Sequence, residues 1–300
     1  FHRVAAQRFG EGKADVAVAL LGGFPGGLFF QFLYSEALFF LLLMGLWWAL
    51  EERRGGVAGA AALLMPLTRA VGVFAVLPLG WVLWTRWKAD EGKQMKDGGC
   101  KMADRLQTPS HPGGEAPTPA HSRGEGAAAR GSSPLRGCRW LLLAAPVAGW
   151  GIYLGLMWRW TGNPWAGVEA QRHWGVQAVS NLWDVPKFVG GFLNVTTWHG
   201  FTGSLLDRVV FLLVLYSLPV QWRLGRDLPA WTLMLAVVPA VSGTLVSFVR
   251  FASCAFPMFL AGTAALAPAR RRWPLACVLT ACGALHLVLL WRFVNYSWAG

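Results

Sequence analysis

Long apolar runs recur along most of this 300-residue chain, and few charged residues interrupt them. Only 14% of the residues are charged, whereas an ordinary soluble domain carries about 25%. A run such as LLLAAPVAGWGIYLGLMW approaches the length of a bilayer crossing and does not alternate as the strand of a barrel would. Because backbone groups inside lipid must be satisfied within a helix, the runs predict an all-α fold, a polytopic transmembrane helix bundle.

About nine of these runs are candidates for membrane segments, since a helix needs about 20 residues to cross the hydrocarbon core. The run at 57–68 is shorter, but it is rich in Ala and Gly, which suits close packing inside a bundle. The expected segments lie at roughly 15–33, 36–50, 57–68, 70–87, 139–158, 204–220, 229–249, 252–267 and 274–292.

The runs divide the chain into three parts. Residues 1–87 and 138–300 hold the N-terminal and C-terminal membrane segments, and residues 88–137 separate them. The separating stretch is rich in Pro, Gly, Ser and Ala and has too little apolar surface to offset the entropy of ordering. We expect a disordered cytoplasmic insertion without a catalytic role; a regulatory docking segment is the alternative. The loop at 159–203 differs, because its tryptophans suit the headgroup level of a membrane.

The net charge of +12 is explained by orientation in the membrane and does not require a nucleic-acid partner. With the N-terminus in the cytoplasm and every segment crossing, 20 of the 27 Lys and Arg residues fall in cytoplasmic loops. The sequence contains no Walker-type phosphate loop, no zinc-protease motif and no Cys-x-x-Cys pair. We therefore expect no nucleotide, no metal and no other cofactor.

The sequence Tyr34-Ser35-Glu36 joins two apolar runs at an expected outer turn. A carboxylate at such a place is costly unless it is paired, hydrated or used, so Glu36 is a candidate for binding sugar hydroxyls or for pairing with Arg69. The alternative is structural: Ser35 caps the next helix and Glu36 lies favourably in its first turn.

Arg69 and Arg250 interrupt apolar runs at two further outer turns. A guanidinium stays charged at low dielectric and binds phosphate through two hydrogen bonds, and the alternative for each arginine is a snorkelling side chain at a helix end. In the 159–203 loop, Gln171, His173 and Trp174 form a dense polar and aromatic group that suits carbohydrate or phosphate recognition, or a plain interfacial loop. We expect the other outer carboxylates, Asp184 and Asp207, to be structural.

These motifs resemble those of the polytopic mannosyltransferases of the GPI mannosyltransferase 2 (PIG-V) type and their bacterial relatives. The resemblance covers most of the chain except 88–137, with the motifs in the family's order. Its residues are Tyr34-Ser35-Glu36, Thr68-Arg69-Ala70-Val71-Gly72, Gly162-Asn163-Pro164 with Gln171 and Trp174, and Arg250-Phe251 with Phe256-Pro257.

The resemblance implies a membrane glycosyltransferase of the GT-C class, in a bacterial plasma membrane or, if the source is eukaryotic, the ER membrane. Such enzymes move a sugar, typically mannose, from a polyprenyl-phosphate-linked donor to an acceptor on the non-cytoplasmic face of the bilayer, with inversion at the anomeric carbon. The expected substrate-binding residues are Tyr34, Glu36, Arg69, Gln171, His173, Trp174 and Arg250.

The family's catalytic Asp lies in the first outer loop, before the region that matches here, so we expect it upstream of Phe1 and interpret this chain as a fragment. Two other functions stay open at this point. One is a lipid transporter or flippase, since intramembrane charge is common to both classes. The other is a catalytically inactive remnant that lacks the base.

Overall fold

The computed structural model describes residues 1–32, 34–85, 88, 139–173, 179–267 and 273–299. In these ranges every regular element is a helix, and the only extended pairing is an isolated bridge between Thr197 and Ser204. The predicted all-α fold is therefore confirmed for the described part of the chain. The insertion expected at 88–137 lies outside the described residues, apart from Lys88.

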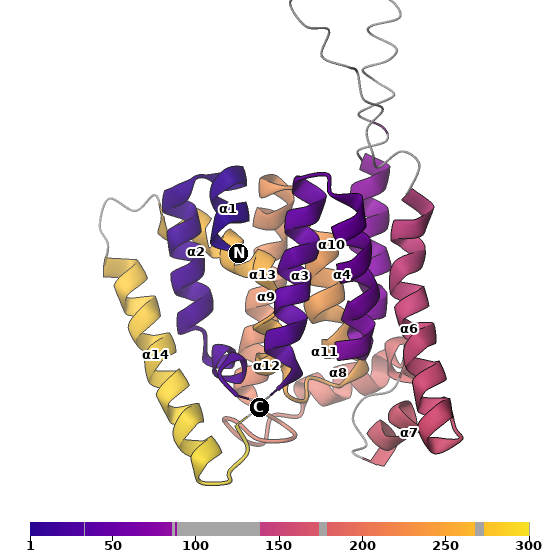
Figure 1. Cartoon of the computed structure of the whole chain (residues 1–300). Helices are drawn as coiled ribbons and strands as arrows, with labels where there is room; N and C mark the ends of the chain where they lie inside the picture. Colours follow the sequence, from indigo (N-terminus) through magenta and orange to yellow (C-terminus); the bar gives the residue numbers. More distant parts are fainter. Residues whose placement is uncertain (33, 86–87, 89–138, 174–178, 268–272, 300) are drawn as a thin grey trace, which may run out of the picture.

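The N-terminal half is a series of helices joined by short turns, most of them running between the two ends of the molecule (Figure 1). Pro25 lies just after the first long helix, and because a proline disfavours helical backbone in the residue before it, Phe24 is extended and the chain turns there into a short 3-10 segment. The elements are α1 (His2–Phe9), α2 (Glu11–Gly23), η1 (Pro25–Phe30), α3 (Ser35–Glu51), α4 (Gly55–Thr68), η2 (Ala70–Ala75) and a helical stretch at 76–85.

The C-terminal half contains the three longest helices and several short ones. The short helix α8 lies across one end of the molecule, transverse to the long helices (Figure 1). The elements are α6 (Arg139–Thr161), α7 (Ala166–His173), η3 (Val179–Trp183), α8 (Val185–Leu193), α9 (Leu205–Leu224), α10 (Leu228–Thr232), η4 (a π-helix, Leu233–Val237), α11 (Val238–Ser242), α12 (Phe248–Ala252), α13 (Phe256–Leu266) and α14 (Trp273–Val294).

Three helices of the described chain are long and apolar enough to cross a membrane: Trp140–Thr161, Leu205–Leu224 and Trp273–Val294. They correspond to the segments expected at 139–158, 204–220 and 274–292. Four further apolar helices are shorter, at 10–17 residues, and one of them confirms the short helix expected at 57–68. The composition and these helices are compatible with a membrane protein, whereas nine crossings of a membrane are not shown by the described residues.

Two expected segments are broken. The segment expected at 15–33 is α2 followed by η1, because Phe24 is extended and Pro25 starts a new turn. The segment expected at 229–249 ends as a helix at Ser242, and α12 begins only at Phe248. The intervening turn contains residues with left-handed backbone, which no continuous helix contains.

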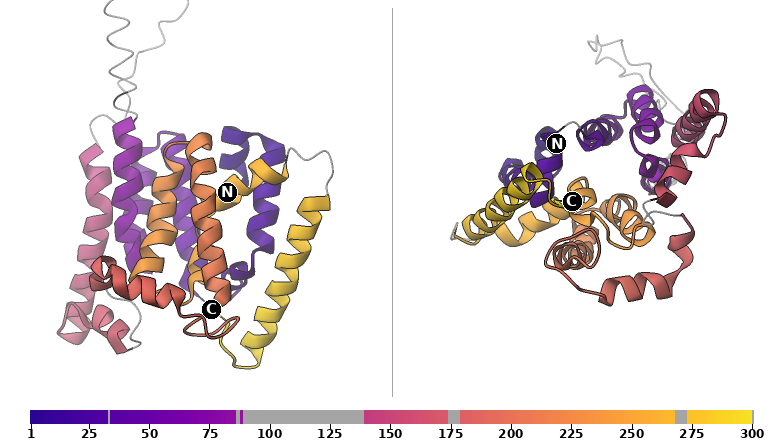
Figure 2. Two further views of the ribbon diagram at one scale, coloured as in Figure 1. Left: turned by 180° about the vertical axis from the view of Figure 1, so that it is seen from behind. Right: turned by 90° about the horizontal axis from the view of Figure 1, so that it is seen from below.

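The turns gather at the two ends of the bundle. The α3–α4 turn, the α9–α10 turn, the start of α6 and the end of α13 lie at one end, the upper end in Figure 1. The opposite end holds η1, α7, α8 and α12 in both side views (Figure 2). We call these the inner and the outer end, after the cytoplasmic and non-cytoplasmic faces that the sequence predicts.

The core between the two ends is apolar and aromatic. Trp47 of α3 packs on Phe256 of α13, with ring centroids 4.6 Å apart, and Trp231 of α10 lies 6.0 Å from the same ring. Glycine permits the closest helix contact: a Cβ at Gly149 of α6 would lie 2.0 Å from the carbonyl oxygen of Leu63 in α4. The packing therefore fixes α3, α4, α6 and α13 relative to one another and leaves polar groups to the ends.

Candidate functional site

Glu36 is the centre of a buried ionic cluster at the outer end. It is the second residue of α3, and its side chain has no exposed surface. Its Oε1 accepts hydrogen bonds from Nη1 of Arg69 and from Nε of Arg250. Arg69 follows the last residue of α4, and Arg250 lies in α12, so three separate elements meet at one carboxylate.

Aromatic rings hold both guanidinium groups in place. The Arg250 guanidinium carbon lies 4.3 Å from the ring centroid of Tyr34 and 5.4 Å from that of Phe29. The Arg69 guanidinium carbon lies 4.7 Å from the ring centroid of Phe251. Cation–π contacts of this kind gain strength when the cation is desolvated, and these side chains are only 13% (Arg69) and 23% (Arg250) exposed.

The cluster carries an excess of positive charge and unused donors. Two guanidinium groups face one carboxylate, which leaves a net charge of about +1. Among the described residues, Arg69 donates a hydrogen bond only through Nη1 and Arg250 only through Nε, whereas a guanidinium has five N–H donors. Oε2 of Glu36 is buried and has no partner in the described chain. The site therefore offers several donors and one acceptor to a ligand that is mainly anionic.

The structure excludes some of the alternatives given for Ser35 and for the two arginines. The helix expected after Tyr34 begins at Ser35, but its N-cap is Tyr34 and no side chain caps it, so the expected Ser35 cap is wrong. Of the alternatives for Glu36, pairing with Arg69 is the one that the structure shows. Neither arginine reaches away into solvent as a snorkelling side chain would, because both point to Glu36.

The rest of the expected site is only partly described. Gln171 and His173 belong to α7, at the outer end (Figure 1), but their side chains and all of Trp174 lie outside the described residues. In the same loop, Asn163 Nδ2 donates to Glu169 Oε2 at 2.8 Å. Asp184 caps α8 by accepting from the backbone N–H of Lys187 at 3.0 Å, so its expected structural role is confirmed.

A second group of buried polar residues lies beside the cluster. The sequence did not predict that these residues come together. Asp207 and His199 have no exposed side-chain surface, and Nδ1 of His199 lies 3.8 Å from Oδ2 of Asp207 and 3.3 Å from Oγ of Ser204. Both groups approach the same ring nitrogen, so the three residues do not form a Ser-His-Asp catalytic triad, in which serine and aspartate contact opposite nitrogens. Burial lowers the pKa of His199, which favours the neutral imidazole.

Arg208 connects the Asp207–His199 group to α8. Its guanidinium donates to four backbone carbonyls, those of Gly191, Phe192, Asn194 and Ser204. These acceptors lie at the C-terminal end of α8 and just before α9, where carbonyls lack helical partners. Because its donors are engaged by backbone, Arg208 is structural, unlike Arg69 and Arg250. In the sequence, the Ser204-x-x-Asp207 spacing is typical of a helix start, and it could have drawn attention to this polar group.

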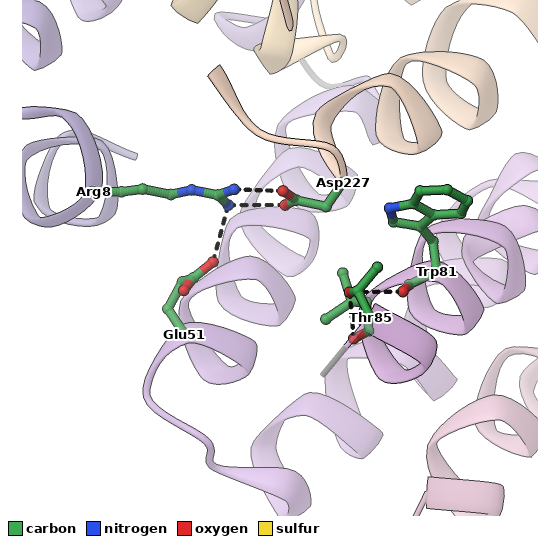
Figure 3. A network of polar contacts seen from close by, with 6 residues as sticks. Arg8, Glu51, Trp81, Thr85 and Asp227 are labelled. Atoms are coloured by element: carbon green, nitrogen blue, oxygen red, sulfur yellow. Dashed lines mark hydrogen bonds and ion pairs between the residues drawn. The ribbon is translucent and has the colours of Figure 1, made fainter. Parts of the chain in front are cut away.

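The inner end holds a separate ionic network, shown in Figure 3. Arg8 of α1 forms a bidentate ion pair with Asp227, in the turn before α10, with 2.8 Å between Nη1 and Oδ2. Nη1 also donates to Oε1 of Glu51, at the end of α3, at 3.2 Å. Nearby, Thr85 Oγ1 donates to the carbonyl of Trp81 at 3.0 Å. Helix α3 thus carries one ion-paired glutamate at each end.

No group of three or more metal-ligating side chains occurs among the described residues. Comparison of the chain with protein-family models, with curated proteins and with solved structures finds no match.

Proposed function

We propose that this protein is a membrane glycosyltransferase that moves a sugar, mannose by the resemblance, from a polyprenyl-phosphate carrier to an acceptor on the non-cytoplasmic face. The observation that carries the proposal is the outer cluster of Arg69, Arg250 and Glu36. It combines buried excess positive charge with unused N–H donors, which is the chemistry that binds a phosphodiester. The bilayer beside the cluster would hold the polyprenyl chain.

The two arginines would stabilise the leaving group. In an inverting transfer, an acceptor hydroxyl oxygen forms a bond to the anomeric carbon while the bond from that carbon to the phosphate oxygen breaks. The electron pair of the broken bond leaves with polyprenyl phosphate, and the hydroxyl proton passes to a carboxylate base. Negative charge therefore grows on the phosphate, and donors fixed beside it lower the barrier because they need no reorganisation.

Glu36 would position substrate rather than act as the base. Its Oε1 is held by two guanidinium groups, which disfavours taking up a proton there. Its Oε2 remains an acceptor that fits a sugar hydroxyl. Tyr34 would contribute by holding the Arg250 guanidinium against its ring, and the α7 region would complete the sugar site through Gln171, His173 and Trp174. By the resemblance, the base would be an Asp that the family carries in its first outer loop.

The test is transfer of radiolabelled mannose from polyprenyl-phosphate-mannose in membranes that contain the full-length protein. Arg69→Ala and Arg250→Ala should each reduce transfer at least tenfold at equal expression, since removing one preorganised donor typically costs about 10²–10³ in rate. Arg159→Ala is the matched control, because Arg159 is an exposed arginine in the last turn of α6 at the same end. Normal transfer by both site variants would disprove the proposal.

A lipid transporter or flippase is the second candidate, and the paired networks of α3 favour it. Ion pairs at Glu36 and at Glu51 close the bundle at opposite ends, which is the arrangement that alternating access would use. Proteoliposomes distinguish the two functions. A transporter would move a fluorescent polyprenyl phosphate across the bilayer without an acceptor, and Arg8→Ala, at the inner end, would change that rate. A transferase would require the acceptor and tolerate Arg8→Ala at equal expression.

A further inference from the structure

The residue before Arg250 is held on one side by a buried carboxylate. The backbone N–H of Val249, in the first turn of α12, donates to Oδ1 of Asp207 at 2.8 Å. Ser247, the N-cap of α12, makes no side-chain cap bond. Asp207, from the first turn of α9, therefore supplies from another helix the acceptor that a helix N-terminus lacks. Phe211 of α9 adds an edge-to-face contact with Phe248, at 5.4 Å between ring centroids.

The same residue is held on its other side by a glycine. A Cβ placed on Gly26, in η1, would lie 2.2 Å from the carbonyl oxygen of Val249. That distance is far below van der Waals contact, so only glycine allows η1 to approach α12 this closely. The contact also brings Phe29 of η1 to the Arg250 guanidinium. Val249 is therefore fixed through its N–H by Asp207 and through its carbonyl by η1.

Helix α12 depends on such contacts because it has only five residues. The turn before it contains three non-glycine residues with left-handed backbone, Thr244, Leu245 and Ser247. Residues adopt this conformation only where surrounding contacts enforce it. The local hydrogen bonds of Arg250, from its N–H to the Ser247 carbonyl and from Ser253 Oγ to its carbonyl, keep the turn of α12 but do not place that turn against α3.

We infer that Asp207 and Gly26 are positioning residues, which hold Arg250 on Glu36 by fixing Val249 between α9 and η1. The inference rests on the proposed function in one respect, which is that Arg250 serves as a phosphate-binding group. Asp207 acts here as a hydrogen-bond acceptor and not through its charge, so asparagine can replace it. Among the described residues, no hydrogen bond or ion pair joins Asp207 to Glu36 directly.

Double-mutant cycles on the full chain in nanodiscs, read by thermal unfolding, test this indirect connection. Asp207→Ala is combined with Glu36→Gln, and in a parallel cycle with Glu51→Gln at the other end of α3. If Asp207 places Arg250 on Glu36, the first pair of substitutions lowers the unfolding temperature by clearly less than the sum of the single effects, because the ion pair is already lost. The second pair should be additive, since distant sites without shared partners add.

The conservative variant separates positioning from general stability. Asp207→Asn keeps an oxygen at the acceptor position, so its cycle with Glu36→Gln should retain the wild-type contribution of Glu36. Additive cycles for Asp207→Ala at both ends of α3 would overturn the inference, and so would Asp207→Asn behaving as Asp207→Ala does.

Gly26 gives a second test that does not depend on the stability of the Asp207 variants. Gly26→Ala should couple to Glu36→Gln in the same way, while Gly45→Ala, on α3 with no heavy atom within 4 Å of its added Cβ, should not. An uncoupled Gly26→Ala would remove Gly26 from the inference.

Transfer assays on the same variants separate this inference from the proposed function. Coupled cycles without any mannose transfer by the wild type would leave the positioning intact and refute the transferase. Mannose transfer by the wild type together with additive cycles would support the transferase and refute the positioning role.

Discussion

Gly72→Ala is expected to disturb the site through its backbone, without changing any polar group. Gly72 lies in η2, three residues after Arg69, and its N–H donates to the Arg69 carbonyl at 2.8 Å. A Cβ at this position would lie 2.5 Å from the carbonyl carbon of Met65 and 2.6 Å from the nitrogen of Pro66. The last turn of α4, which carries Arg69, or η2 itself would have to move to relieve these contacts.

The magnitude follows from the required movement. An ordinary contact of a Cβ with backbone begins near 3.4 Å, so the two elements would have to separate by roughly 0.9 Å. Such overpacking costs about 1–3 kcal/mol. Replacing glycine also restricts the unfolded chain, which stabilises by about 0.4–1 kcal/mol. Gly80→Ala shares that second effect but not the first, because its nearest neighbour would be Leu143 Cδ2 at 3.9 Å.

The assay is thermal unfolding of both variants in nanodiscs, beside binding or transfer of the lipid-linked donor. Since unfolding entropy scales with length, 1 kcal/mol corresponds to about 1.5 °C for 300 residues, and Gly72→Ala should unfold at least about 1.5 °C below Gly80→Ala. Its transfer should also fall, because Arg69 moves with α4. Equal unfolding temperatures for the two variants would refute the steric argument, and normal transfer by a destabilised Gly72→Ala would separate Gly72 from the placement of Arg69.

Three further substitutions have expected outcomes. Glu36→Gln leaves two largely buried guanidinium groups without a counter-charge and should cost about 3–5 kcal/mol of stability. Glu51→Gln should cost much less, because the Glu51 side chain is 32% exposed. Thermal unfolding measures both effects. Gly149→Ala should destabilise by about 1–3 kcal/mol through its contact with Leu63, while Gly151→Ala, on the same helix with open space around it, should not. Burial lowers the pKa of His199 below 6.5, so on acidification the unfolded chain takes up the proton before the folded protein does. Stability should therefore fall as the pH drops below about 6.5, and His199→Gln should weaken that dependence. An unchanged pH profile of the variant would contradict this role of His199.

The sequence was informative where composition or local spacing decides the structure. Apolar runs predicted many of the helices, and the expected alternation of successive segments predicted which turns share an end of the bundle (Figure 1). The Glu36–Arg69 pair was one of the alternatives that the sequence offered for Glu36, because a carboxylate between two apolar runs is costly unless it is paired, hydrated or used.

Contacts between distant parts of the chain could not be predicted in this way. Asp207 and Val249 are 42 residues apart, and the hydrogen bond between them depends on how α9 packs on α12. The left-handed turn before α12 was also missed, because threonine, leucine and serine rarely adopt that conformation and give no local signal for it. The end of α2 at Gly23 was readable in principle from Pro25, but the apolar residues that follow it concealed the break.

The order in which the partners of Glu36 leave the ribosome follows from their positions in the chain. Arg69 is 33 residues after Glu36, and Arg250 is 214 residues after it. At about 5–20 residues per second, Arg69 is synthesised within roughly 2–7 s of Glu36, but Arg250 only after roughly 10–40 s. During biogenesis Glu36 would therefore have Arg69 as its counter-ion well before Arg250 exists. Arg69 would then serve the insertion of the first helices, whereas Arg250 would complete a pair that is already formed.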